Sequence, residues 1–359
     1  MPRHVLATTP GKLILMGEHA AVYGRPALVA AVAPRTRVEV TEYTAGVVVE
    51  LPDLDRELRS NWSELAAVAE AARIQWEAFS ENPIAERFEA LRSSDPAHLV
   101  ELALGEVAVE LGADLPPMTL HVKSDLPVGS GFGSSAAVAV GLVGGVLCFM
   151  EGVAARPLVD RIAFDVERRQ HGMPSGVDHR TVLQGGILWA ERSSGGELLT
   201  TPVEGGQLLG SRIQVLHTGQ PSETTGDVVA AVRQLAYEDQ AGFDRLLHRM
   251  ESSVDGFRDW LRSGAGDLDR AITAIRDYET CLEAIGVVPA SVQQAIREVE
   301  ALGGAAKISG AGALSGEAAG CLLVCWPDTW DGRSPKGLSA YNLQDVELGV
   351  PGLTCEVEG

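Results

Sequence analysis

Three glycines separated by single residues and followed at once by two serines form the part of this sequence best suited to chemistry. Gly129, Gly131 and Gly133 permit positive φ angles and let the backbone approach a ligand closely. Ser134 and Ser135 stand where a run of small, helix-compatible residues begins. Because the start of a helix offers free N–H groups and the positive end of its dipole, this stretch predicts a binding loop for an anion such as a phosphate.

Three structural interpretations compete for this loop: a P-loop, a dinucleotide-binding fingerprint and a glycine-rich turn without a ligand. A P-loop requires a lysine directly before the serine, and no lysine stands beside Ser134. A dinucleotide-binding fingerprint requires an acidic residue at the end of the following strand, and Glu151 lies near that distance. The residues before Glu151 continue a helix, however, so it ends no strand. The third interpretation is a glycine-rich turn without a ligand, and the loop alone leaves it open.

Five further residues have side chains suited to catalysis or binding, although each also has an ordinary structural explanation. Lys12 is one of only four lysines in the chain and follows a Pro-Gly pair. Glu18 and His19 follow an apolar segment, but a solvated acid and a hydrogen-bonded histidine are their ordinary roles. Glu167, near a predicted helix end, would ordinarily be a surface acid. Asp178 follows Pro-Ser-Gly and would ordinarily cap a turn or helix.

Hydrophobic periodicity predicts the elements that must position these residues. Alternation over 118–124 predicts a strand directly before the glycine loop, and the residues after Ser134 predict a helix. Further strands are predicted over 5–16 (interrupted by a Pro-Gly turn), 29–42, 184–191 and 321–326. Helices are predicted over 53–115, 157–171 and 224–302. A loop is predicted over 328–340. A second unit is expected to start near Ile213.

Composition restricts the class of protein. With 359 residues, 45% hydrophobic and 22% charged, the chain is an ordinary globular protein long enough for two domains. A net charge of −20 argues against nucleic acid or an anionic membrane as the main partner. The longest apolar run, 136–150, suits a buried helix, and the N-terminus lacks an apolar signal core, so we expect a cytoplasmic protein. Five cysteines without metal-ligand spacing are expected to be reduced and buried.

Three segments, in order, resemble the motifs of the GHMP small-molecule kinases. They are 10–24 (PGKLILMGEHAAVYG), 127–137 (PVGSGFGSSAA) and 307–312 (KISGAG). The resemblance covers about residues 8–326. It implies a two-domain α+β GHMP kinase fold: a ribosomal-protein-S5-like α/β domain over 1–205, carrying the ATP loop, and a ferredoxin-like α/β domain over 206–359.

Within this family, two segments most resemble the members that act on mevalonate: GEHAAVYG over 17–24 and HGMPSGVD over 171–178. The resemblance therefore implies ATP-dependent phosphorylation of the primary hydroxyl of mevalonate to 5-phosphomevalonate, a step in isoprenoid precursor synthesis. It implies ATP and Mg²⁺ as cofactors and small molecules as partners. It is compatible with a homodimer.

The resemblance also implies a role for each motif residue. Asp178 and Lys12 would meet at the acceptor hydroxyl, Ser135 and Glu167 would hold Mg²⁺, and Glu18, His19 and Thr225 would lie on the acceptor side. The residues expected to bind ATP are Pro127, Gly129, Ser130, Gly131, Gly133, Ser134, Ser135 and Ala136. A third-motif loop would comprise Lys307, Ser309, Gly310, Ala311 and Gly312. Such a site would work by positioning and by neutralising charge, because phosphoryl transfer passes through a loose transition state.

The chain departs from the family pattern at three places. Phe132 stands where leucine is usual, and the third motif continues Ala-Leu-Ser-Gly instead of a run of glycines, which predicts a stiffer loop. Gly226 follows Thr225 where an arginine is common, so a cation for the substrate carboxylate is absent there. The alternatives are a related kinase for phosphomevalonate or a sugar, a non-catalytic ligand-binding protein of this fold, and a nicotinamide-dependent oxidoreductase.

Overall fold

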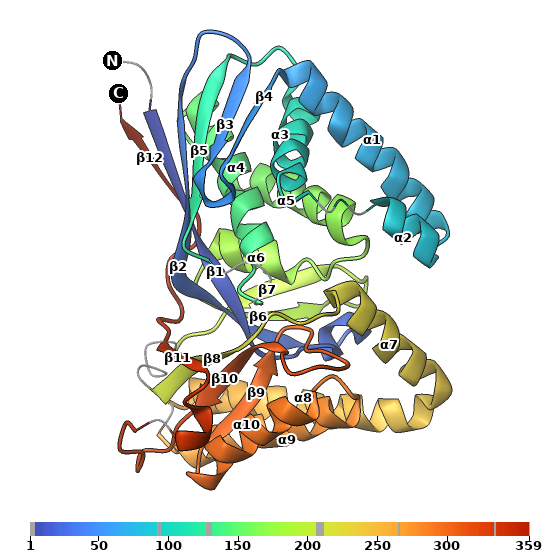
Figure 1. Ribbon diagram of the computed structural model, residues 1–359, viewed down its shortest axis with the longest axis vertical. Helices are drawn as coiled ribbons and strands as arrows, with labels where there is room; N and C mark the ends of the chain where they lie inside the picture. The colour runs from blue at the N-terminus through green and yellow to red at the C-terminus, as the bar shows by residue number, and fades with distance from the viewer. Residues whose placement is uncertain are drawn as a thin grey trace.

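The computed structural model describes residues 4–91, 93, 95–126, 131–205, 212–264, 266–333 and 335–358. Two β-sheets, each covered by helices, lie one above the other in Figure 1. The first residues of the described chain lie in the upper sheet, and the strands between residues 213 and 345 build the lower one. This is the mixed α+β arrangement that the sequence predicts.

The upper sheet has eight strands, in the order β12-β1-β2-β5-β3-β4, with β6 paired to β2 and β7 to β6. Its two longest strands, β1 and β2, pair antiparallel over most of their length and carry most of its buried side chains. The strands are β1 (His4–Met16), β2 (Ala27–Glu42), β3 (Val47–Leu51), β4 (Arg56–Ser60), β5 (Met118–Ser124), β6 (Ile187–Arg192), β7 (Leu198–Pro202) and β12 (Thr354–Glu358).

Helices pack against one face of this sheet (Figure 1). They are α1 (Trp62–Glu81), α2 (Ala85–Leu91), α3 (His98–Leu111), α4 (Ser134–Glu151), α5 (Arg156–His171) and α6 (Val177–Gln184). Helix α4 lies directly against β1 and β2. Among the described helices only α4 is long and apolar enough to cross a membrane, and 72% of it is buried in this core. That burial is typical of the central helix of a globular domain, as its Gly and Ala content predicts.

The lower sheet has four antiparallel strands in the order β11-β8-β10-β9. These are β8 (Ile213–Gly219), β9 (Ala305–Ser309), β10 (Gly320–Cys325) and β11 (Asn342–Asp345). The accompanying helices are α7 (Thr225–Glu238), α8 (Gln240–Arg262), α9 (Leu268–Ala284) and α10 (Ala290–Ala301). Amphipathic α8 and α9 pack on each other, and Trp260 of α8 and Ile275 and Tyr278 of α9 are fully buried.

The last described strand returns to the upper sheet. Strand β12 pairs antiparallel with β1 from His4↔Glu358 to Thr8↔Thr354, and the two chain ends lie side by side in Figure 1. The boundary predicted between 205 and 206 adjoins residues 206–211, which lie outside the described chain. It therefore stays a prediction.

Four details differ from the sequence predictions. Strand β1 runs without a turn, because the Pro-Gly pair is absorbed as a register shift between Pro10 and Gly11. The region 53–115 is not helical throughout, since it holds the exposed strand β4. The predicted loop 328–340 contains a 3-10 helix, Lys336–Leu338. Lys307 and Ser309, predicted as loop residues, lie on β9. All five cysteines lie in the described chain and none forms a disulfide; four are buried, as predicted, but Cys355 is half-buried.

Candidate active site

Lys12 and Asp178 form an ion pair between the first strand and the first turn of α6. The Lys12 Nζ lies 3.2 Å from the Asp178 Oδ2. The lysine side chain is 5% exposed and the aspartate 37% exposed, so the pair opens to solvent only on the aspartate side. Gly176, with φ 80°, caps α6 and turns the chain so that Asp178 points toward β1. The predicted meeting of these two residues is thus present in the fold.

The end of the glycine loop packs on Lys12. A Cβ atom at Gly133, which has φ +69°, would lie 2.6 Å from the Lys12 Cγ. The Lys12 backbone N–H donates to the Phe132 carbonyl at 2.8 Å. Gly133 is therefore required both for its left-handed backbone and for the passage of the lysine stem.

Helix α4 begins at this point without a side-chain cap. Ser134 and Ser135 are half-buried and Ala136 is buried. An uncapped helix start with half-open serines fits a phosphate group, whose oxygens accept from free N–H groups and hydroxyls. Pro127, Gly129 and Ser130 lie outside the described residues, so their predicted ATP contacts stay predictions.

Glu167 is buried, not a surface acid, and a histidine accounts for this. The Glu167 Oε2 lies 3.1 Å from the His179 Nδ1, and the His179 Nε2 lies 3.1 Å from the Asp160 Oδ1. Burial alone would lower the pKa of His179, but the hydrogen bonds to Asp160 and Glu167 outweigh it and raise the pKa to about 9. No contact is recorded between Glu167 and Ser135, so their shared role as Mg²⁺ ligands stays a prediction.

The side-chain oxygens of Glu167 and Ser135 are of the kind that binds Mg²⁺. Carboxylate and hydroxyl oxygens are the ligands this cation prefers, and it usually takes few of them from a protein. The described residues contain no cluster of three metal-ligating side chains. A Mg²⁺ ion here would therefore take its remaining ligands from nucleotide phosphates and water.

Glu18 has a buried partner from the lower sheet. Its side chain and that of Lys307 are both 0% exposed, and the Lys307 Nζ donates to the Glu18 Oε1. The Tyr278 hydroxyl donates to the Glu18 carbonyl at 2.7 Å. Burial raises the pKa of the Glu18 carboxyl, although Lys307 opposes that shift. The ordinary alternative of a solvated loop acid is wrong, and direct contact between Glu18 and the acceptor stays a prediction.

His19 connects the first motif to the third. It has φ 59°, unusual for a residue with a side chain, and its Nε2 donates to the Ala311 carbonyl at 2.8 Å. Ser309 Oγ donates to the Ile14 carbonyl at 3.1 Å, and a Cβ at Gly131 would lie 2.7 Å from the Ser309 carbonyl oxygen. All three motifs therefore converge at one place.

The backbone explains why glycine stands at the other two positions of the third motif. Gly310 and Gly312 have φ of +117° and +74°. A Cβ at Gly312 would lie 2.2 Å from the Val287 carbonyl oxygen, so backbone approach alone demands glycine there.

Thr225 is not brought to the other predicted residues by any recorded contact. It is exposed in the first turn of α7. The adjacent Gly226 packs against Phe88, whose ring would lie 2.9 Å from an added Cβ. A residue larger than glycine at this position would therefore require the Phe88 ring to shift.

His179 and Asp160 escaped the sequence analysis. A signal was available, because Asp160 and Glu167 are seven residues apart, on one face of a helix, and His179 follows Asp178 directly. Nothing in the sequence alone shows that α6 packs on α5 there.

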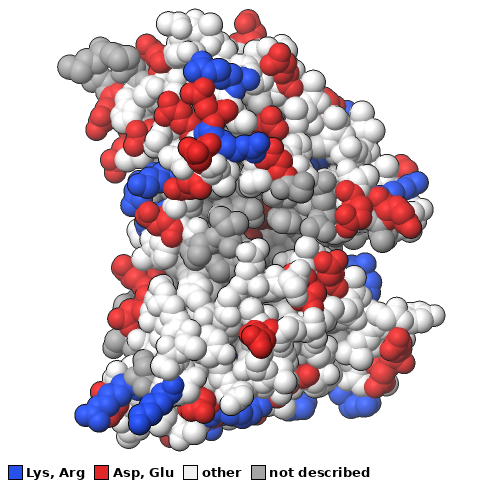
Figure 2. Space-filling model, in the orientation of Figure 1, with Lys and Arg blue, Asp and Glu red and all other residues white. Residues whose placement is uncertain are grey.

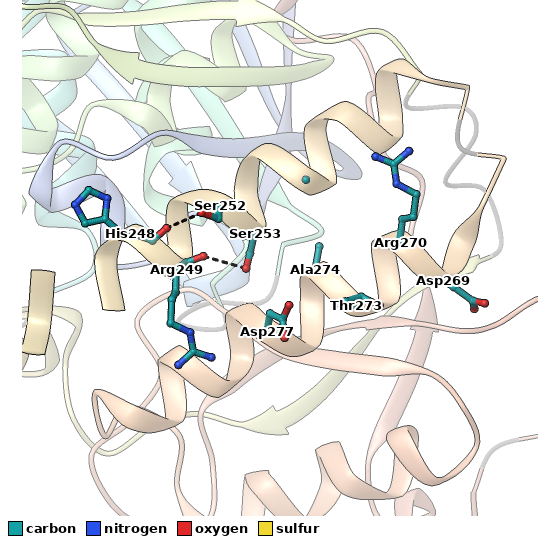
Figure 3. A pocket seen from close by; sticks show the side chains of 10 residues that line it. His248, Arg249, Ser252, Ser253, Asp269, Arg270, Thr273, Ala274 and Asp277 are labelled. Atoms are coloured by element: carbon teal, nitrogen blue, oxygen red, sulfur yellow. Dashed lines mark hydrogen bonds between the residues drawn. The ribbon is translucent and has the colours of Figure 1, made fainter. Parts of the chain in front are cut away.

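An open groove of about 680 Å³ lies between α8 and α9, and it contains none of the predicted site residues. In Figure 3 Arg249 and Asp277 line one part of it and Asp269 and Arg270 another, so both charges are present. On the face in Figure 2 acidic side chains are widely spread with Lys and Arg among them. In that view Lys and Arg gather mainly along the lower edge of the molecule.

Comparison with known proteins shows which family the chain is similar to. The GHMP kinase N-terminal domain model matches residues 98–186. A mevalonate kinase of Thermococcus sibiricus is 30% identical over 334 residues, 90% of each chain. The bovine mevalonate kinase is 29% identical, covering 98% of this chain and 94% of its own. The crystal structure of Methanococcus jannaschii mevalonate kinase aligns with a TM-score of 0.73 at 17% identity, covering 96% and 98% of the two chains.

The fold itself is shared more widely. Lactococcus lactis galactokinase complexed with galactose aligns with a TM-score of 0.70 at 16% identity, covering 98% and 95% of the two chains. The chain belongs to the GHMP kinases, the family of ATP-dependent small-molecule kinases that its three motifs resemble. Within that family, the relatives that match it over nine tenths of both sequences are mevalonate kinases.

Proposed function

We propose that this enzyme transfers the terminal phosphoryl group of ATP to the primary hydroxyl of mevalonate, giving 5-phosphomevalonate and ADP. The observation that carries the proposal is the Lys12–Asp178 pair at 3.2 Å, beside the uncapped start of α4. An acid and a cation next to a phosphate-binding helix start are what transfer to an alcohol requires.

In this proposal Asp178 orients the hydroxyl and accepts its proton as the oxygen attacks the terminal phosphorus. The bond between that phosphorus and its bridging oxygen breaks, and ADP leaves. The positive charge of Lys12 stabilises the Asp178 carboxylate and the negative charge that develops on the attacking oxygen. Ser134 and Ser135 bind phosphate oxygens, and Ser135 and Glu167 would hold Mg²⁺, which supplies charge neutralisation when bound. His19, Glu18 and Thr225 are proposed for the acceptor side.

A second candidate is a related kinase acting on phosphomevalonate or a sugar, and Gly226 favours the sugar, because a sugar, unlike phosphomevalonate, has no carboxylate to be bound. Where a cation for a carboxylate is common, Phe88 packs instead. The comparison structures of this fold include enzymes for other alcohols, so the fold does not choose between them. A cytoplasmic location and a homodimer belong to the proposal as well, and cell fractionation and light scattering test them.

Asp178→Asn tests the catalytic assignment. The change keeps the shape but removes charge and proton acceptance, so kcat should fall at least about 10²-fold. Nucleotide affinity should persist, because the glycine loop is untouched. ADP release is measured with mevalonate, phosphomevalonate, galactose and homoserine as acceptors, and the melting temperature is recorded in parallel. Normal turnover with a lowered melting temperature would show that Asp178 is only a helix cap.

The acceptor panel separates the two candidate functions. Activity confined to mevalonate supports the first, and a preference for another alcohol supports the second. A chain that binds nucleotide but phosphorylates none of the four compounds would overturn the proposed reaction with mevalonate.

A further inference from the structure

His179 bridges two acids on the neighbouring helix. Asp160 and Glu167 lie two helical turns apart on α5, and the imidazole lies between them with a distance of 3.1 Å at each ring nitrogen. The ring is 1% exposed and stacks on Phe164 with ring centroids 5.3 Å apart. A planar ring held on two edges and one face has no freedom to rotate.

This bridge engages one oxygen of the proposed Mg²⁺ ligand. Within the described chain, hydrogen bonding involves only the Oε2 of Glu167. The carboxylate is thereby fixed in rotation, and its second oxygen is left for another partner. The residue that does this follows Asp178 directly, so the same short helix carries both groups.

Arg180 provides a natural comparison within the same cluster. Its Nε and Nη2 lie 3.1 and 3.2 Å from the Asp160 carboxylate, and it has no recorded contact with Glu167. Both residues therefore hold α6 against α5 through Asp160, but only His179 reaches Glu167.

We infer that His179 is a positioning residue that orients Glu167 for Mg²⁺, with Asp160 fixing the far side of the imidazole. This inference rests on the proposed function, in which Glu167 holds the metal of MgATP. Groups that orient a metal ligand through a hydrogen bond typically change metal affinity or activity by about 10- to 100-fold when they are removed.

The test compares His179→Asn with Arg180→Gln by calorimetric titration of ATP with and without Mg²⁺, on the full chain without an acceptor. The asparagine amide is too short to bridge both carboxylates. We expect the ATP affinity of His179→Asn without metal to stay within about twofold of the wild-type value. The factor by which Mg²⁺ increases ATP affinity, the Mg²⁺ gain, should fall at least about tenfold. Arg180→Gln should lower the melting temperature and retain the Mg²⁺ gain.

Glu167→Gln completes the design. If His179 acts through Glu167, adding His179→Asn to Glu167→Gln should change the Mg²⁺ gain no further, because coupled residues are not additive. Equal behaviour of the His179 and Arg180 variants, or an undiminished Mg²⁺ gain in His179→Asn, would overturn the inference. A wild-type chain whose ATP binding ignores Mg²⁺ would instead contradict the proposed function. Should His179→Asn not fold, Asp160→Asn is the substitute. It weakens the far side of the bridge and the contact with Arg180 but leaves the bond between His179 and Glu167, so it is expected to reduce the Mg²⁺ gain by a smaller factor than His179→Asn and by more than Arg180→Gln. No reduction there would also overturn the inference.

Discussion

At the scale of single residues, burial divides the charged groups by role. Lys12 is nearly inaccessible, and its positive charge is compensated by Asp178, which remains half-open. An ammonium group removed from water requires such a partner. Among the described residues, the open side of the carboxylate is then where a hydroxyl can approach the pair. This asymmetry distinguishes a reacting ion pair from the fully enclosed pair of Glu18 and Lys307.

The buried carboxyl group of Glu106 should make the stability of the protein depend on pH. Glu106 on α3 lies 3.1 Å from Arg169, and burial raises its pKa from 4.5 to about 7, although Arg169 opposes the shift. A carboxyl whose pKa is raised on folding binds more protons in the folded state, so its stabilising contribution is complete below pH 4.5 and is lost as the pH rises through 7.

Glu106→Gln should therefore flatten this part of the profile. Between pH 5 and 8 the wild-type protein should lose about 2 kcal/mol of unfolding free energy more than the variant does, after a discount for partial solvent screening. Urea unfolding at pH 5, 6.5 and 8 measures the difference. Parallel profiles for the two proteins would show that Glu106 is already ionised when folded at pH 5.

At the scale of elements, the start of α4 and the stem of Lys12 share one space. Gly133→Ala should cost about 1–2 kcal/mol for its left-handed backbone. It should also push Lys12 away from Asp178, because the new Cβ would lie 2.6 Å from Cγ, and so lower kcat by about 10²-fold. Melting curves and turnover numbers are compared on the same preparations.

Gly286→Ala is the matched control. Gly286 has φ +79°, and an added Cβ would meet nothing within 4 Å. It should show a similar loss of stability with unchanged kcat. If both variants lose activity equally, general strain and not displacement of Lys12 is responsible.

Elements with strong patterns were predictable, and those stabilised by their surroundings were not. Strand β5 alternates apolar and polar residues, and α4 begins at Ser134 as predicted. Strand β4 (Arg-Glu-Leu-Arg-Ser) is mostly exposed, and pairing with β3 alone makes it a strand. The partners of Glu18 and Glu167 could not be predicted either, because they also depend on contacts with other elements of the fold. Lys307 is 289 positions from Glu18, and no local pattern records a contact over that distance.

At the scale of the whole molecule, the first and third motifs join the two sheets. Glu18 pairs with Lys307, His19 with the carbonyl of Ala311, and Ser309 with that of Ile14. Each of these contacts connects the end of β1 to β9 or the loop after it. The relative position of the two layers in Figure 1 is therefore fixed at the proposed site of reaction.

The buried ion pair between these layers gives the prediction with the largest expected effect on stability. Lys307→Met leaves the Glu18 carboxylate buried without its cation, and the Glu18 Oε2 has no hydrogen-bond partner in the described chain. Breaking such a pair on one side costs about 3–5 kcal/mol. Combining Lys307→Met with Glu18→Gln removes the stranded charge, so the double variant should be more stable than Lys307→Met alone.

The exposed pair of Arg73 and Glu70 serves as control, since Arg73→Met should cost less than about 1 kcal/mol. Urea unfolding of the three variants and the wild type measures these differences. A double variant no more stable than Lys307→Met would mean that the lysine stabilises the molecule through packing and its bond to the Ile308 carbonyl, and not through Glu18.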